Sequence, residues 1–374
     1  MPRLLAWFAQ NARDLPWRRT LDPYAIWVSE VMLQQTQVKT VVPYWERWLR
    51  ALPTVAALAR ARPTKVLKLW EGLGYYTRAR NLHAAAKVVV ARYGGRFPED
   101  FDEVLSLPGV GRYTAGAICS IAFNQPTPVL DGNVARVLTR VFGIEAEPRA
   151  STTRALLWQL AERLVQRAAA VEAGPARNCS SLNQALMELG AVICTPRNPR
   201  CRDCPVLRLC RACKEDRVND LPTSRRRVPA TSRRFIAFVA ERHGSFLVRQ
   251  RPAGGVNAHL WEFPNLDVTA GQPRVGLLAR ELFGAAPCRL RGLGQIEHTI
   301  TRYRITMEVH QVRFDGAAPK PSPGERWLTV RQLDRLAFPS AHRKALRLVA
   351  SLRRENAAPR SRARGRAVPS ASSE

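Results

Sequence analysis

The chain has 374 residues, 46% of them hydrophobic, which is enough for two or three domains with buried cores. Its 59 basic residues outnumber the 30 acidic ones, and the formal net charge is +29 at pH 7. Such an excess indicates a polyanionic partner, most often nucleic acid, bound in a salt-dependent manner. The sequence has no run of about eighteen apolar residues and no signal-peptide pattern at its N-terminus. We therefore expect an intracellular, cytoplasmic protein without a membrane segment.

Residues 1–213 are predicted to be mostly helical. Apolar residues recur there at helical spacing, and Pro16, Pro53, Pro148 and the Gly72-Leu-Gly74 turn interrupt the pattern. The predicted helices are Leu4–Gln10, Tyr24–Trp48, Pro63–Glu71, Arg78–Tyr93, Phe101–Leu105, Tyr113–Phe123, Val134–Phe142, Thr152–Ala169 and Ser181–Ile193. We expect one helical domain over residues 1–214.

Residues 233–352 have the pattern of a second, α+β domain. The dipeptide His243-Gly244 is a hairpin signal between two short apolar runs, and a later segment alternates apolar and polar side chains like a half-buried strand. The predicted strands are Phe235–Ala240, Phe246–Arg249 and Arg302–Phe314, and the predicted helices are Arg274–Phe283 and Ser340–Leu352. Residues 215–232 are polar and basic, which predicts an interdomain linker along or near DNA. Residues 353–374 are predicted to form a disordered basic tail.

The segment Leu107-Pro-Gly-Val-Gly-Arg-Tyr-Thr-Ala-Gly-Ala117 places Gly109-Val110-Gly111 before a predicted helix. A glycine hairpin that opens a helix exposes backbone N–H groups, which suit one phosphate of a nucleic-acid backbone. The same pattern also fits an ordinary turn. Asp131 begins another predicted helix twenty residues after Gly111, and a carboxylate near a bound phosphate indicates chemistry on DNA. Alone, an aspartate before a glycine indicates only a turn and a helix cap.

Glu30 lies in a predicted helix with mostly apolar neighbours three and four positions away. Such neighbours would desolvate the carboxylate and raise its pKa, as a general acid requires. Spacing alone nevertheless favours an ordinary, half-exposed helix glutamate. Tyr75-Tyr76 follows the Gly72-Leu-Gly74 turn and is suited either to wedge between bases or to fill the core of a loop.

Four cysteines, Cys194, Cys201, Cys204 and Cys210, fall within one short loop after a helix. Four sulfur ligands suit zinc or an iron–sulfur cluster, and the spacing does not decide between them. Surrounding arginines allow the loop to present positive charge to phosphates. Cys213 lies outside this pattern and is not expected to be a metal ligand.

Residues 1–213 resemble the helix-hairpin-helix DNA glycosylases of the endonuclease III superfamily, and within it the adenine glycosylase (MutY) branch. The matching stretches are Leu15-Pro-Trp-Arg18, Asp22–Val38, Leu107–Ala117, Leu130–Val134, Asn183–Thr195 and the four cysteines. The resemblance implies a [4Fe–4S] cluster on those cysteines, base flipping of an adenine out of double-stranded DNA, and base excision repair of adenine paired with 8-oxoguanine or guanine. We expect a monomer that associates with the nucleoid through DNA.

The resemblance also implies roles for individual residues. Glu30 would protonate an adenine ring nitrogen, and Asp131 would stabilise the oxocarbenium-like sugar before water completes the hydrolysis. Arg18, Leu33 and Gln184 would line the adenine pocket, and Asn133 would support Asp131. Gln35 and Tyr75 would fill or wedge the base stack, and Gly109, Val110 and Gly111 would bind DNA.

Tyr113 distinguishes two reaction types. Bifunctional relatives carry at this position a lysine that forms a Schiff base and cleaves the strand. Because tyrosine cannot form that imine, we expect a monofunctional glycosylase.

Residues 233–352 resemble the Nudix-like domain of the same branch, which recognises 8-oxoguanine. Gly244–Pro252 and His259-Leu-Trp-Glu-Phe-Pro264 carry this match. A Nudix hydrolase needs a run of acidic residues to bind its metal. Here only Arg280-Glu281 remains of that run, which favours a base-recognition domain over a pyrophosphate hydrolase. Ile300-Thr301-Arg302 stands where the family often has Phe-Ser-His. Thr301 keeps a hydroxyl for lesion recognition, and Arg302 is a permanent cation that suits guanine-type acceptors or phosphate, or simply begins a strand.

Two other functions compete with this one. The first is a bifunctional thymine or oxidised-pyrimidine glycosylase-lyase of the endonuclease III type, against which Tyr113 and the second domain argue. The second is a non-catalytic DNA-binding scaffold. Glu30 and Asp131 argue against a scaffold, since binding requires neither carboxylate near phosphates.

Overall fold

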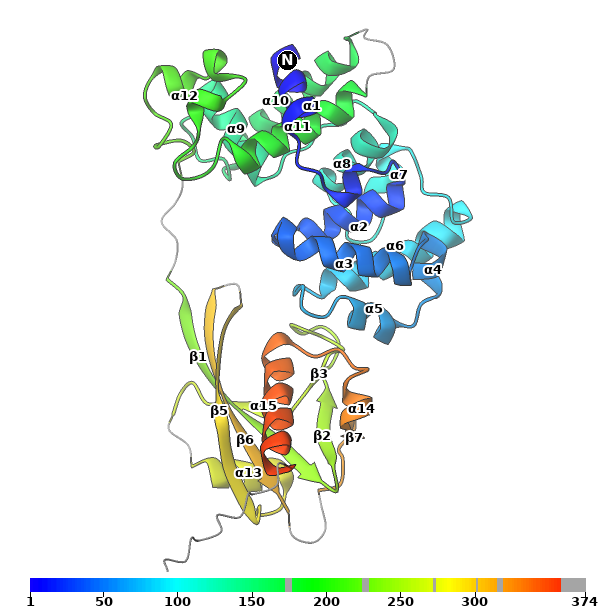
Figure 1. The fold of residues 1–374 in the computed structure, drawn as a ribbon, viewed down its shortest axis with the longest axis vertical. Helices are drawn as coiled ribbons and strands as arrows, with labels where there is room; N and C mark the ends of the chain where they lie inside the picture. Colours follow the sequence, from blue (N-terminus) through cyan, green and yellow to red (C-terminus); the bar gives the residue numbers. More distant parts are fainter. Residues whose placement is uncertain (172–176, 224–228, 272–273, 301, 315–318, 358–374) are drawn as a thin grey trace, which may run out of the picture. The chain divides into compact units, whose positions relative to one another are not determined.

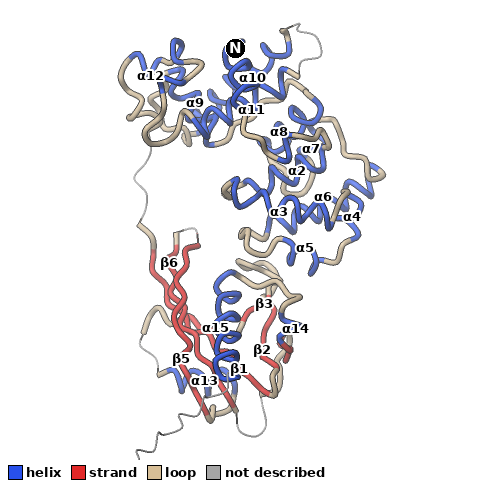
Figure 2. The backbone as a smooth tube through the Cα atoms, viewed as in Figure 1, coloured by secondary structure: helices blue, strands red, loops and turns tan. Residues whose placement is uncertain are grey.

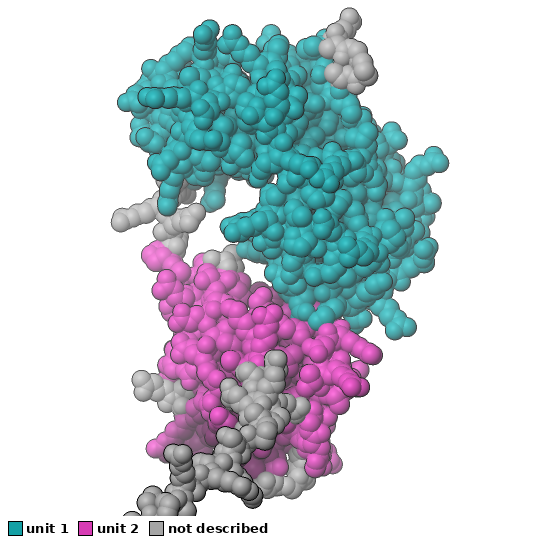
Figure 3. Space-filling view, viewed as in Figure 1, with its two compact units in different colours: residues 1–228 teal, residues 229–374 magenta. Residues whose placement is uncertain are grey.

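The structure is a computed structural model that describes residues 1–171, 177–223, 229–271, 274–300, 302–314 and 319–357. The chain divides into two compact units, Met1–Val228 and Pro229–Glu374 (Figure 3). Among the described residues, no helix is long and apolar enough to cross a membrane.

Unit 1 is helical (Figure 1). Its α-helices and short 3₁₀ helices (η) are α1 Pro2–Asn11, η1 Pro16–Arg18, α2 Pro23–Leu33, α3 Val38–Ala51, α4 Val55–Arg60, α5 Pro63–Leu69, α6 Thr77–Tyr93, α7 Phe101–Leu105, α8 Arg112–Phe123, α9 Gly132–Phe142, α10 Ser151–Ala169, α11 Asn178–Val192, η2 Cys201–Asp203, η3 Leu207–Leu209 and α12 Arg211–Lys214. Local signals explain many of the ends. Side chains of Asp22, Asp100 and Asp131 cap α2, α7 and α9, and Gly94 and Gly143 end α6 and α9 in the left-handed conformation.

Helix α11 is central to unit 1 and packs against α1, α8, α9 and α10. Its apolar residues Leu182, Leu186 and Leu189 belong to the main buried cluster. Two glycines bring backbones together near the cavity described below. A Cβ at Gly190 would lie 2.6 Å from the Asn133 side chain, and one at Gly116 would lie 2.1 Å from the Pro128 carbonyl oxygen. These close approaches hold the start of α9 against α8 and α11.

The predicted helix Tyr24–Trp48 is wrong as one helix, because α2 ends at Leu33 and α3 begins at Val38. Gln35, in the turn between them, has φ +56°. The carbonyl oxygens of Val31, Met32 and Gln34 accept hydrogen bonds from the Arg78 guanidinium, which comes from a distant part of the sequence. A tertiary contact therefore ends a helix whose apolar pattern would have continued.

Unit 2 contains a mixed seven-stranded sheet with helices (Figure 2). Its elements are β1 Thr231–Arg242, β2 Ser245–Gln250, β3 Trp261–Glu262, β4 Asn265–Asp267, α13 Val275–Phe283, β5 Arg289–Ile300, β6 Tyr303–Arg313, β7 Glu325–Thr329, α14 Val330–Leu333 and α15 Ser340–Ala357. The order is β3-β2-β1-β6-β5, with β4 paired to β1 and β7 paired to β2. Only the β1–β6 pair among the described strands is parallel.

Alternation along β1 explains why helices cover both faces of this sheet. Ile236 and Phe238 pack in one cluster with Ala279 of α13. Ala237 and Val239 pack in another cluster that includes residues of α14 and α15. The predicted hairpin is confirmed, since His243 and Gly244 both have positive φ, as a two-residue turn between twisted strands requires.

The segments predicted as linker and tail are partly folded. Leu221 is buried, and its carbonyl oxygen accepts a hydrogen bond of 2.8 Å from Arg140 Nε, so this end of segment 215–232 packs on unit 1. Thr231 and Ser232 already belong to β1. Helix α15 extends to Ala357, into the segment predicted to be a disordered tail. Residues 224–228 and 358–374 lie outside the described residues.

Candidate active site

A cavity of about 650 Å³ opens in unit 1, between η1, α2, α8, the start of α9 and α11. Eight residues singled out from the sequence line it: Arg18, Glu30, Leu33, Gln35, Tyr113, Asp131, Asn133 and Gln184. They come from segments that are far apart in the chain, so the fold assembles one site from the separate motifs.

Glu30 is buried on α2, with only 5% of its surface exposed. The structure therefore overturns the half-exposed interpretation that spacing alone favoured. Tyr113 Oη donates a hydrogen bond of 2.7 Å to Glu30 Oε2. Burial raises the pKa of Glu30 from 4.5 to about 7, although the Tyr113 hydrogen bond opposes the rise. This carboxyl group can consequently hold a proton near neutral pH.

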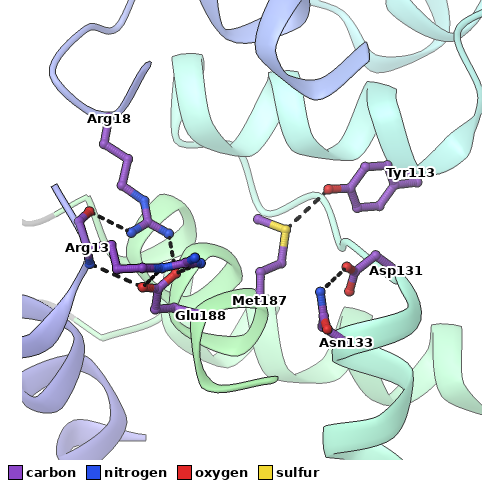
Figure 4. Close-up of polar contacts among 7 residues, drawn as sticks. All are labelled: Arg13, Arg18, Tyr113, Asp131, Asn133, Met187 and Glu188. Atoms are coloured by element: carbon purple, nitrogen blue, oxygen red, sulfur yellow. Dashed lines mark hydrogen bonds and ion pairs between the residues drawn. The ribbon is translucent and has the colours of Figure 1, made fainter. Parts of the chain in front are cut away.

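Asp131 caps helix α9 and also lines the cavity. Its Oδ1 accepts from the Val134 amide at 2.7 Å, and its Oδ2 accepts from Asn133 Nδ2 at 2.9 Å (Figure 4). Arg136 Nη2 in turn donates to Asn133 Oδ1 at 2.8 Å, which orients the amide. Burial raises the pKa of Asp131, and these two donors together with Arg136 oppose the rise by favouring the carboxylate.

Tyr113 projects from α8, and its hydroxyl also lies 3.2 Å from Met187 Sδ (Figure 4). Burial and the adjacent Glu30 and Asp131 raise the pKa of this phenol well above its ordinary value. Tyr113 is therefore a neutral hydrogen-bond donor to Glu30.

An ion-pair network around the buried Glu188, which no sequence motif revealed, forms another wall of the cavity. Arg13 Nε and Nη2 donate to the two Glu188 carboxylate oxygens at 2.7 and 2.8 Å, and Arg18 Nη2 donates to Glu188 Oε2 at 2.9 Å (Figure 4). Burial alone would raise the pKa of Glu188, but hydrogen bonds from both arginines lower it to about 2. One sequence signal could have indicated Glu188. It lies four residues after Gln184, a predicted pocket residue, and therefore on the same face of α11.

A second pocket of about 230 Å³ lies beside Gln35 and is also lined by Tyr75 and Gly109. Gln35 lines both cavities, and Tyr75 is 46% exposed with φ +46°. Gly109 has φ +75°, and a Cβ there would lie 2.5 Å from the Asn81 side chain. The Val110 side chain is buried, whereas Gly111 caps α8, so the hairpin can offer backbone groups to a ligand.

The four predicted cysteines line one small apolar pocket next to α9 and α11. Arg140, which is 1% exposed, donates to Cys194 Sγ at 3.3 Å and to the Thr195 carbonyl oxygen at 2.8 Å. Cys213, which is not expected to be a metal ligand, lines the same pocket. In the described part of the chain, no three His, Cys, Asp or Glu side chains converge on a single-ion site. The cysteines are instead distributed around the pocket.

In unit 2, Arg302 lies between β5 and β6 and is exposed. Its guanidinium donates to Tyr303 Oη at 3.1 Å and lies 5.3 Å from the centre of the Tyr303 ring. Arg233 lies 4.8 Å from the same ring. Thr301 lies outside the described residues.

Known proteins match both units. Residues 28–163 match the family of HhH-GPD superfamily base excision DNA repair proteins, and residues 236–348 match the NUDIX domain. The chain is 39% identical to an adenine DNA glycosylase from Rattus norvegicus, over 94% of this chain and 78% of the relative. It is 38% identical to the human adenine DNA glycosylase, over 92% of this chain and 73% of the relative.

Among solved structures, a thermostable thymine-DNA glycosylase matches with a TM-score of 0.51 and 32% identity, over 57% of this chain and 94% of that protein. Unit 1 thus has the helical fold of the endonuclease III superfamily, and unit 2 is a Nudix-like α+β domain. With both domains and more than two thirds of each full-length relative matched, the chain belongs to the adenine DNA glycosylase family.

Proposed function

We propose that this protein is a monofunctional adenine DNA glycosylase of base excision repair. Its substrate would be double-stranded DNA with adenine paired to 8-oxoguanine or guanine. The protein would flip the adenine into the 650 Å³ cavity and hydrolyse its N-glycosidic bond, acting as a monomer. The observation that carries this proposal is the pairing of buried Glu30 with the Tyr113 hydroxyl in the same cavity as Asp131.

The two carboxyl groups suit opposite tasks. With a pKa of about 7, Glu30 can donate its proton to an adenine ring nitrogen and so improve the leaving group. Asp131, whose ionised form the Val134 amide and Asn133 favour, would stabilise the positive charge that develops on the sugar, electrostatically or through a transient covalent bond. Water completes the hydrolysis. Paired carboxyl groups in different protonation states are the general requirement of glycoside hydrolysis.

The walls of the cavity would recognise the base. Arg18, Leu33 and Gln184 provide a cation, an apolar surface and an amide. Glu188 holds the Arg18 guanidinium, and Ser180 Oγ accepts from Gln184 Nε2 at 3.1 Å, so both polar groups are oriented before a base enters.

The DNA contacts would come from the neighbouring pocket and the hairpin. Gln35 and Tyr75 would enter the base stack as the adenine leaves it, and the backbone of Gly109-Val110-Gly111 would bind a phosphate. In unit 2, Arg302 and Thr301 would contribute to recognition of the base opposite adenine.

Five cysteines line this pocket, and the four at the predicted spacing fit an iron–sulfur cluster, which takes four cysteine ligands. We therefore assign Cys194, Cys201, Cys204 and Cys210 as ligands of a [4Fe–4S] cluster. When bound, the cluster would cross-link this loop. Arg140 would donate to a ligand sulfur and anchor the loop to α9. A brown protein with visible absorption is expected, and a colourless protein with stoichiometric zinc would contradict the assignment.

A bifunctional thymine or pyrimidine glycosylase is the rival, and the 32% identity to a thymine-DNA glycosylase favours only its thymine specificity. Single-turnover assays distinguish the two on duplexes with adenine opposite 8-oxoguanine, guanine or thymine, and with thymine opposite guanine, each with borohydride trapping. We expect adenine release without a trapped adduct, because Tyr113 has no amine. Release of thymine, or efficient trapping, would refute the proposed function.

A further inference from the structure

Arg78, on α6, connects the two turns that carry Gln35 and Tyr75. We propose that Arg78 is a positioning residue for base extrusion, holding both turns in the conformation that enters the DNA stack. This inference rests on the proposed function and concerns a residue that lies outside the chemistry at Glu30 and Asp131.

One side of the Arg78 guanidinium holds the turn after α2. Nη1 donates to the carbonyl oxygens of Val31, Met32 and Gln34 at 2.9, 3.0 and 2.5 Å. Nη2 lies 3.3 Å from Thr36 Oγ1. These acceptors lie on both sides of Gln35, so the guanidinium sets the direction in which the chain leaves the helix.

The same guanidinium also holds the turn before α6. Nη2 donates to the carbonyl oxygens of Leu73 and Gly74 at 3.1 and 3.2 Å. The charge lies 5.2 Å from the centre of the Trp70 ring and 5.5 Å from that of the Tyr75 ring. Tyr75 is therefore contacted directly, and the two residues before it are fixed through their carbonyl groups.

The backbone conformations show why such an anchor is needed. Gln35 and Tyr75 have φ of +56° and +46°, in the left-handed region that residues other than glycine rarely adopt. Residues keep such conformations only where surrounding contacts impose them. Both line the same 230 Å³ pocket, so one buried cation fixes the spacing between two side chains from different turns.

Only an arginine suits this position. Its planar guanidinium presents several N–H groups in fixed directions, whereas a lysine ammonium is a single compact charge. At 9% exposure Arg78 has lost most of its contact with water, and carbonyl oxygens replace the water at its two Nη groups, whereas Nε is buried without a hydrogen-bond partner among the described residues. An Arg78→Lys substitution would retain the charge but could not bind both turns at once.

Arg177 provides a matched control within the same unit. Its guanidinium also holds carbonyl oxygens at a helix end, those of Ile121 and Ala122 at 2.8 and 2.7 Å. It lines neither pocket described above. Arg177→Lys therefore reports the general cost of replacing a carbonyl-binding arginine.

The direct test measures extrusion without catalysis. In the Glu30→Gln protein, binding to a duplex with 2-aminopurine opposite 8-oxoguanine should increase fluorescence as the base leaves the stack. We expect Arg78→Lys to reduce this increase at least tenfold while duplex affinity changes less than threefold, and Arg177→Lys to preserve it. Thr36→Val removes the contact with Arg78 Nη2 and the hydrogen bond of 3.4 Å from Thr36 Oγ1 to the Gln34 carbonyl oxygen, and it leaves the other Arg78 contacts in place. It should reduce the increase two- to threefold, which keeps the test valid if Arg78→Lys does not fold.

Adenine release gives the second readout. With Glu30 intact, Arg78→Lys should slow release opposite 8-oxoguanine at least tenfold, but release from an unpaired bulge less than threefold. Equal losses on both substrates, an unchanged extrusion signal, or equal effects of Arg177→Lys would overturn the inference. A wild-type protein that releases no adenine would instead refute the proposed function, so the two failures are distinguishable.

Discussion

Replacing Tyr113 by phenylalanine should raise the pKa of Glu30 and move the pH dependence of base excision. In the wild-type protein, excision should decline as pH rises through about 7, because the Glu30 acid loses its proton there. Tyr113→Phe removes the hydroxyl that donates to Glu30 Oε2 at 2.7 Å and keeps the ring that fills the space. The carboxylate then loses its stabilising donor, while its burial stays the same.

The size of the effect follows from the strength of that hydrogen bond. A hydrogen bond to a charged group contributes about 1.5 to 3 kcal/mol, and one pKa unit corresponds to about 1.4 kcal/mol. The hydroxyl also interacts with the protonated acid, so the net difference should lie at the lower end. The declining limb of the pH–rate profile should therefore move upward by about 1 pH unit.

The assay is single-turnover adenine release from pH 5 to about 9, with enzyme in excess so that product release does not contribute. Tyr24→Phe is the matched control, because Tyr24 Oη also donates a buried hydrogen bond, to the Leu52 carbonyl oxygen at 2.8 Å, but does not line the cavity. Its profile should coincide with that of the wild type. An unchanged or downward-shifted limb in Tyr113→Phe would refute the assignment of Glu30 as the acid controlled by this hydroxyl.

Three further substitutions test the carboxyl groups separately. Glu30→Gln should increase the free energy of unfolding above pH 7 by about 3 kcal/mol but leave it unchanged below pH 4.5. The reason is that the raised pKa of Glu30 makes the wild-type free energy of unfolding fall as pH rises from 4.5 to 7. Urea unfolding below pH 4.5 and above pH 7 measures this difference. Asp131→Asn should retain duplex binding and melting temperature, because asparagine also caps helices, while excision falls at least about 100-fold; full activity would contradict its role. Glu188→Gln should cost about 3 kcal/mol in urea unfolding at pH 7, because it leaves the Arg18 cation without its buried counter-ion; a change below about 1 kcal/mol would show that the pair contributes little.

The sequence was most informative where a local signal and a chemical requirement coincide. Asp131 precedes a glycine and caps α9, and that capping geometry also directs its carboxylate into the cavity. Gly109 has φ +75° in the turn that opens α8, Gly111 is the N-cap of that helix, and the turn forms as predicted. The cysteine spacing likewise predicted four sulfur ligands in one short loop, and these cysteines line one pocket. In each case, neighbouring residues determine the geometry.

Features that depend on distant contacts could not be predicted in this way. Glu30 is buried and contacts Tyr113, which lies 83 positions away, whereas spacing within its own helix favoured a half-exposed glutamate. The end of α2 depends on Arg78, whose importance no local pattern indicates. Glu188 was overlooked because a single acidic residue in an apolar helix is significant only once Arg13 and Arg18 are brought to it.

Three carboxyl groups line the cavity, and the number and charge of their hydrogen-bond donors explain why burial affects their pKa values differently. Glu188 accepts from two arginines, and its pKa falls to about 2 in spite of burial. Asp131 accepts from uncharged amides, which only partly oppose the effect of burial. Glu30 has the single Tyr113 hydroxyl, and its pKa reaches about 7. A lysine in place of Tyr113 would add a cation beside Glu30 and lower the pKa of this acid further than the neutral hydroxyl does. A neutral residue at position 113 therefore excludes a Schiff base and also leaves Glu30 better able to hold its proton.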